Sequence, residues 1–144
     1  MKPNVAVLSG FGINCEIETM AVFEMAGAIA DRVHVNRLVM GDAQLSDYQI
    51  MAIPGGFSFG DHLGSGRLLG NRLRFGLREQ VREFVTAGNP VIGICNGFQV
   101  LVKMGLLPGD DEVSLTQSAS LALNDSGHYE NRWATLEFDQ ASPC

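Results

Sequence analysis

The stretch "NPVIGICNGFQVLVKMG" (89–105) places a short apolar run, a cysteine and an amphipathic segment directly after one another. Residues 89–94 are typical of a buried parallel strand, and residues 96–105 predict a mostly buried helix that ends at Gly105. Cys95 falls between them, where the chain must turn sharply. A strand that passes at once into a helix is the repeating unit of α/β folds, so this stretch indicates the fold class.

The turn around Cys95 has the G-x-C-x-G pattern of a nucleophile elbow. Gly93 and Gly97 are small enough to let strand and helix approach closely. The cysteine then projects from the carboxyl edge of the sheet, where open α/β folds bind their ligands. The unpaired N–H groups at a helix start favour a thiolate over a thiol. Free cysteines often simply pack in a core, but this setting favours a nucleophile.

The rest of the chain repeats the alternation of strand and helix patterns. Further strands are predicted at 4–10, 31–39 (with His34 in mid-strand), 48–56 and 132–138. A further helix follows Asn14 as a possible N-cap, with apolar residues at helical spacing between 17 and 28 and Gly27 as its stop, and another is predicted at 74–88 with Gly88 as C-cap. Residues 109–128 read as a loop or a weak hairpin. Together these elements predict one α/β domain over 1–144, with a doubly wound, mainly parallel sheet and helices on both faces.

The composition excludes several classes of protein. The 144 residues are 46% hydrophobic and carry a net charge of −6, which indicates a globular domain and argues against binding nucleic acid. No apolar run approaches the roughly 20 residues that cross a bilayer, so no membrane association is expected. Three widely spaced cysteines form neither a disulfide framework nor a metal site, which favours a cytoplasmic location.

A cysteine elbow that acts on an acyl group also needs an oxyanion hole. The backbone N–H of Asn96, directly after the nucleophile, is one candidate donor. Gly56, in the "PGG" turn that ends the third predicted strand, is the second. Asp61 either caps the next segment or orients the glycine-rich loop, and the sequence does not separate these roles. Cys15 is interpreted as a structural thiol.

Several motifs together resemble one enzyme family. They are "GINCE" (12–16), "PGGFSFGD" (54–61), "GICNGFQ" (93–99), "GLLPG" (105–109) and "NDSGHYENRW" (124–133). In combination they resemble the class I glutamine amidotransferases, and within them the glutaminase subunits of phosphoribosylformylglycinamidine synthase. The resemblance covers essentially the whole chain and implies the flavodoxin-like fold of that family.

The resemblance implies a complete reaction. Cys95 would attack the side-chain amide of glutamine, form a γ-glutamyl thioester and release ammonia. The N–H groups of Gly56 and Asn96 would hold the oxyanion, and Gln99 would help bind glutamine. The ammonia would pass to a synthetase partner that uses ATP and Mg²⁺, bridged by a small third subunit, in purine biosynthesis. No cofactor is expected in this chain.

The sequence departs from the family pattern at the general base of this reaction. Family members activate the cysteine with a histidine followed two residues later by a glutamate, and His128 with Glu130 matches only superficially. The surroundings of His128 instead match the strand entry that precedes the family motif. We therefore expect that the chain lacks the C-terminal segment that carries the catalytic histidine and glutamate. Its fold would be incomplete at this end, and its glutaminase turnover would be weak or absent.

Two alternatives stay open. One is another cysteine-elbow α/β hydrolase, although such proteins usually carry a histidine shortly after the cysteine. The other is a non-catalytic module that docks on a synthetase without hydrolysing glutamine.

Overall fold

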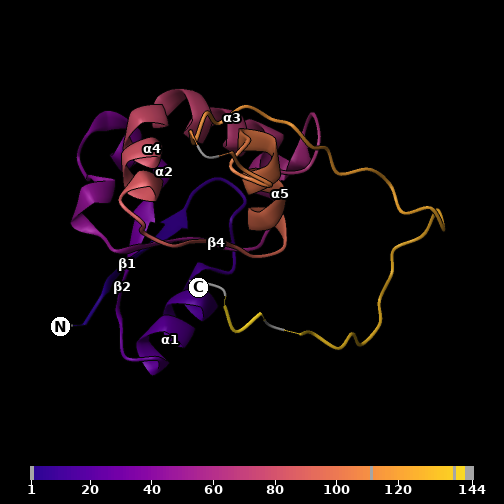
Figure 1. The fold of residues 1–144 in the computed structure, drawn as a ribbon, viewed down its shortest axis with the longest axis horizontal. Helices are drawn as coiled ribbons and strands as arrows, with labels where there is room; N and C mark the ends of the chain where they lie inside the picture. The colour runs from indigo at the N-terminus through magenta and orange to yellow at the C-terminus, as the bar shows by residue number, and fades with distance from the viewer. Residues whose placement is uncertain (1, 111, 138, 142–144) are drawn as a thin grey trace.

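The computed structural model describes residues 2–110, 112–137 and 139–141 and contains a four-stranded parallel sheet (Figure 1). The strands are β1 (Asn4–Ser9), β2 (Ile29–His34), β3 (Ile50–Ile53) and β4 (Val91–Gly93), in the order β2-β1-β3-β4. The α-helices are α1 (Glu16–Met25), α2 (Val35–Met40), α3 (Arg67–Gly76), α4 (Arg78–Thr86) and α5 (Asn96–Met104). Two short 3-10 turns are η1 (Leu45–Asp47) and η2 (Ser58–Asp61). The predicted parallel α/β fold is confirmed.

Helices cover both faces of the sheet, because the central strands β1 and β3 are apolar on both sides. α1 lies alone on one face, where Met20 and Phe23 pack against Val5 and Val7 of β1 (Figure 1). The other helices lie on the opposite face and share the larger core. Its members include Leu8 from β1, Ile53 from β3, Leu38 from α2, Leu73 from α3, Phe84 from α4 and Met104 from α5.

The second predicted strand is too long. β2 ends at His34, and residues 35–40 form α2 instead of continuing the strand. His34 is the N-cap of α2, since its Nδ1 accepts a hydrogen bond of 3.1 Å from the backbone N–H of Asn36. The apolar alternation of this stretch was misleading because Val35 and Leu38 are buried on one side of a single helical turn.

The helix predicted at 74–88 is also wrong in its bounds. The chain forms α3 and α4 with a break at Leu77, whose backbone (φ −130°, ψ 20°) leaves the helical region. Within α4, Val81 and Phe84 are buried, as expected for one apolar face of a helix. Asn14 is not the N-cap of α1, because Cys15 takes that position without a side-chain bond.

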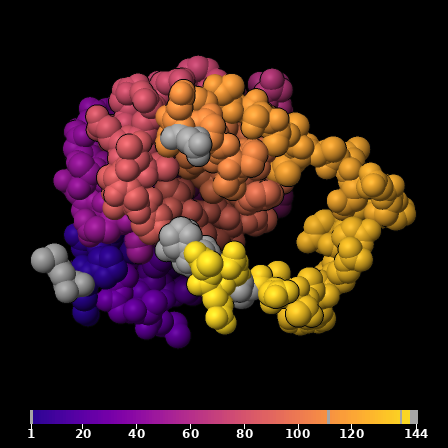
Figure 2. Space-filling model, viewed as in Figure 1, coloured from indigo at the N-terminus to yellow at the C-terminus, as the bar shows by residue number. Residues whose placement is uncertain are grey.

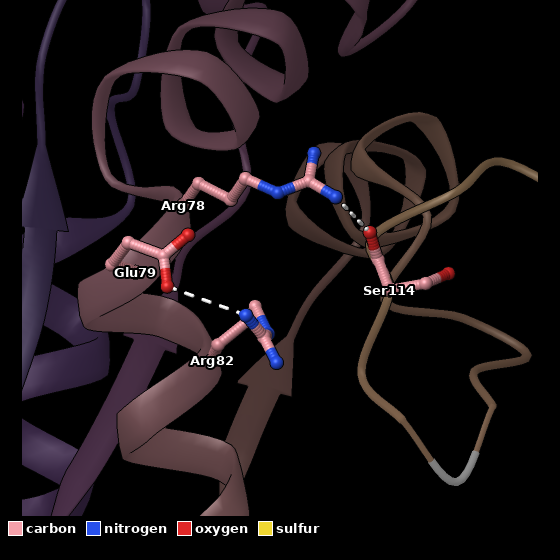
Figure 3. A network of polar contacts seen from close by, with 4 residues as sticks. All are labelled: Arg78, Glu79, Arg82 and Ser114. Atoms are coloured by element: carbon pink, nitrogen blue, oxygen red, sulfur yellow. Dashed lines mark hydrogen bonds and ion pairs between the residues drawn. The ribbon is translucent and has the colours of Figure 1, made fainter.

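After α5 the described residues contain neither a helix nor a strand. The strand predicted at 132–138 is therefore wrong for 132–137, and residue 138 lies outside the described residues. The chain first docks on the body: Leu115 is buried, and the guanidinium of Arg78 in α4 donates a 2.7 Å hydrogen bond to the carbonyl of Ser114 (Figure 3). Farther on it forms an arm that arches away from the body (Figure 2).

In the described part of the chain, no helix is both long enough and apolar enough to cross a membrane.

Candidate functional site

The structure places Cys95 in a sharp turn between β4 and α5. Its backbone has φ 54° and ψ −112°, a sparsely populated region for a residue that carries a Cβ, and the residue is exposed. The carbonyl of Cys95 already accepts the first bond of the helix, from the N–H of Gln99. This is the geometry of a nucleophile elbow, in which the side chain is held out of the turn and away from the core.

Two glycines make the turn sterically feasible. A Cβ on Gly93 would lie 2.6 Å from the carbonyl oxygen of Gly97 and from Leu101 Cδ1. A Cβ on Gly97 would overlap the carbonyl oxygen of Ile53, at the end of β3. The elbow therefore packs directly on the end of the neighbouring strand, and only glycine fits at either position.

The Pro54-Gly55-Gly56 turn that follows β3 lies beside the elbow. A Cβ on Gly55 would lie 3.4 Å from Cys95 Cβ and 3.6 Å from Cys15 Sγ, so both cysteines approach this glycine. The sequence did not reveal that Cys15 lies so close to the elbow, because the two residues are far apart in the chain.

The loop after β1 holds the turn from its other side. The N–H groups of Asn14 and Cys15 donate to the carbonyl of Gly55, each at 3.3 Å, and the N–H of Phe57 donates to Gly12 at 2.7 Å. Gly56 itself has φ 144°. Among the described residues its N–H has no backbone acceptor, and neither has the N–H of Asn96 in the first turn of α5.

The side chain of Asn96 joins the elbow to the glycine-rich loop. Its Oδ1 accepts from the backbone N–H of Ser58, and its Nδ2 donates to Asp61 Oδ1 and to Gln99 Oε1, each at 3.0 Å. Asp61 therefore does orient the loop, and it also accepts from Ser65 Oγ through its second oxygen. The sequence suggested only the backbone of Asn96. The signal for this network was a pair of amide side chains, Asn96 and Gln99, in the first turn of a mostly apolar helix.

The three histidines lie in different parts of the molecule. His34 caps α2, His62 is exposed just after η2, and His128 is exposed in the C-terminal arm. The backbone of His128 bonds to Ser126 and Asn124 in its own turn. Within the described residues, no hydrogen bond joins a histidine to Cys95. The structure thus brings together Cys95, Gly56, Asn96 and Gln99, but not His128.

Comparison with known proteins agrees with this geometry. The sequence profile of the CobB/CobQ-like glutamine amidotransferase domain matches residues 2–144. Phosphoribosylformylglycinamidine synthase subunit PurQ of Dehalococcoides mccartyi is 45% identical over 143 residues, which are 99% of this chain and 55% of that protein. The subunit PurQ of Methanococcus maripaludis is 44% identical over 95% of this chain and 51% of the relative.

A solved structure gives the same result. A chain in the structure of PurLQS from Thermotoga maritima superposes with a TM-score of 0.71 at 30% identity, over 92% of this chain and 54% of that one. The chain thus spans about half the length of the relatives that it matches.

Proposed function

The chain belongs to the CobB/CobQ-like glutamine amidotransferase domain family, and we propose that it carries the nucleophile of a glutaminase that supplies ammonia to phosphoribosylformylglycinamidine synthesis. One observation carries the proposal: the strained backbone of Cys95 presents an exposed thiol directly beside the Gly55–Gly56 turn. A packing cysteine would need neither this backbone conformation nor two glycines that only fit by lacking a Cβ.

In this reaction Cys95 Sγ attacks the carbon of the glutamine side-chain amide. The oxygen of that amide becomes an oxyanion, held by the N–H groups of Gly56 and Asn96. Collapse of the intermediate breaks the C–N bond, and ammonia leaves with a proton from a general base that first took the thiol proton. Water then hydrolyses the γ-glutamyl thioester to glutamate and restores the thiol. Gln99 contributes to binding of the substrate.

The names of the relatives support the proposal that the ammonia is used in phosphoribosylformylglycinamidine synthesis. The curated relatives are named as subunits of phosphoribosylformylglycinamidine synthase, and the solved neighbour belongs to PurLQS. We infer a synthetase as partner, which uses ATP and Mg²⁺ to consume the ammonia, together with a small bridging subunit. A protein of this kind acts in the cytoplasm.

The proposal assigns none of the three histidines as the base. His34 accepts a backbone hydrogen bond through Nδ1 as a helix cap, His62 is exposed just after η2, and His128 lies in the exposed arm. None of the three has a hydrogen bond to Cys95 within the described residues. The base would come from outside residues 1–144, and these residues alone would show weak or no turnover. Robust glutamate release by this chain that is abolished by His128→Ala would contradict this assignment.

The test is covalent labelling with 6-diazo-5-oxo-L-norleucine, a glutamine analogue that alkylates the nucleophile. We expect one label at Cys95, located by peptide mass spectrometry, with a rate lowered at least tenfold by excess glutamine but not by asparagine. Cys95→Ala abolishes the label, and the control Cys15→Ala keeps it. Equal labelling of Cys15 and Cys95, or a rate that glutamine does not change, would overturn the proposal.

A further inference from the structure

We propose that the side chain of Asn96 is a positioning residue, which locks the loop 57–61 to the nucleophile elbow and so sets Gly56 against Cys95, with Asp61 as the anchor of that side chain. This role differs from that of the Asn96 backbone N–H and rests on the proposed function. It would make the oxyanion site and the nucleophile one connected unit.

The hydrogen bonds of Asn96 leave no freedom in its orientation. Its carbonyl oxygen faces a donor, the N–H of Ser58, and its two amide hydrogens face two acceptors, Asp61 Oδ1 and Gln99 Oε1. Rotating the amide by half a turn would put NH₂ against N–H and oxygen against oxygen. Because Asn96 is only 2% exposed, water could not compensate for such a mismatch.

The loop needs an external anchor because its own backbone is strained. Phe59 and Asp61 have positive φ angles of 55° and 52° without being glycine. Each such conformation is unfavourable by about 1 kcal/mol or more and persists only where contacts enforce it. Two backbone bonds tie the loop to the segment after β1, from Phe57 to Gly12 and from Phe59 to Phe11. Asn96 ties the same loop to α5, at Ser58 and again at Asp61.

The near-isosteric substitution Asn96→Asp tests this arrangement. A carboxylate there still accepts from Ser58 but places its second oxygen against two further acceptors, those of Asp61 and Gln99. Adding Asp61→Asn restores a donor opposite that oxygen, and the amide of Gln99 turns to present its NH₂. In the double variant, residue 61 donates the hydrogen bond and residue 96 accepts it, the reverse of the wild type. The shapes of both side chains and the total charge stay the same.

Two measurements on the same chain decide the proposal. The first is amide hydrogen exchange of Ser58 and its neighbours, which reports loop attachment whether or not the chain acts on glutamine. The second is a ratio of two labelling rates of Cys95, that with 6-diazo-5-oxo-L-norleucine divided by that with iodoacetamide. Iodoacetamide needs only an accessible thiol, so the ratio reports the glutamine-binding site separately from the accessibility of the thiol. Thermal unfolding of each variant establishes that it is folded.

We expect Asn96→Asp to accelerate exchange of Ser58 and to lower the labelling ratio about tenfold. Asp61→Asn alone keeps an oxygen opposite Asn96 Nδ2 and can turn its NH₂ toward Ser65 Oγ, so it should change both much less. The double variant should recover most of both. Asn124→Asp adds the same charge at an exposed position and should change neither. An Asn96→Asp variant that matches the wild type, or a double variant no better than Asn96→Asp, would overturn the proposal. Unprotected labelling of the wild type would refute only the proposed glutaminase, since exchange would still decide the role of Asn96.

Discussion

The backbone of Cys95 is strained, and the strain is maintained by its neighbours. Gly97 sits in the first turn of α5 against the carbonyl oxygen of Ile53, and Gly93 faces the carbonyl of Gly97. These contacts fix where β4 ends and where α5 begins, so the φ of 54° at Cys95 follows from the path of the chain on both sides. The position of the Cys95 thiol therefore depends on the absence of a Cβ at Gly93 and at Gly97.

Because of these contacts, Gly97→Ala should lower the free energy of unfolding, although a glycine-to-alanine change in a helix usually raises it. In an open helix the substitution stabilises by about 1 kcal/mol, because alanine has the higher helix propensity. Here the new Cβ overlaps Ile53, and we expect a net loss of about 2 kcal/mol in the free energy of unfolding, measured by urea denaturation. The shifted elbow should also slow the labelling of Cys95 at least tenfold.

Gly27→Ala is the matched control for that experiment. Gly27 has φ 93°, and a Cβ there meets nothing within 4 Å. The substitution should lower stability by about 1 kcal/mol through backbone conformation alone and leave the labelling of Cys95 unchanged. A stabilised Gly97→Ala variant would show that β3 and α5 can separate without penalty.

At the level of elements, the sequence was most informative where local pattern and burial coincide. The elbow and the helix to Gly105 were predicted nearly to the residue, since glycine-bounded helices leave strong signals. The strand predicted over 89–94 forms only as β4 (Val91–Gly93), and the prediction that it is buried was wrong, because β4 lies at the edge of the described sheet and Ile92 is 44% exposed. The turn from β2 into α2 was missed, because Val35 suits either element and only the cap at His34 distinguishes them. Contacts between distant segments, such as Asn96 with Asp61, have no periodic signature, so the sequence could not predict them.

The segment after α5 shows that burial need not follow regular structure. Leu115 is 1% exposed in the large core, although the residues around it form neither helix nor strand. We expect Leu115→Ala to lower the free energy of unfolding by about 3 kcal/mol, the usual range for a buried leucine. Leu123→Ala, at a position 93% exposed, should change it by less than about 0.5 kcal/mol. Equal effects in urea denaturation would show that the segment is not docked.

On the scale of the whole molecule, the sheet is unevenly covered. α1 packs on β1 and β2. Ile92 of β4 pairs with Ala52 of β3, which faces the α1 side of the sheet, so Ile92 points to that same face, where it is 44% exposed. Ile94, just after β4, is 45% exposed. The alternating apolar residues of 132–138 would suit a strand beside this exposed apolar surface. In the structure, however, residues 132–137 lie in the exposed arm. We therefore expect the stability of the protein to come from the body, with little contribution from the exposed arm that begins at residue 118.

That separation predicts the outcome of a deletion. All described residues from 118 onward are exposed, so removal of 118–144 should change the free energy of unfolding by less than about 1 kcal/mol. It should also leave the rate of Cys95 labelling unchanged. Removal of 113–144 takes away Leu115 and should lower stability by about 3 kcal/mol. Thermal unfolding of both deletions against the intact chain measures the difference. If the shorter deletion alone lowers the melting temperature by about 5 °C or more, the arm packs on the body in solution, and the strand expected at 132–138 is the first candidate for that contact.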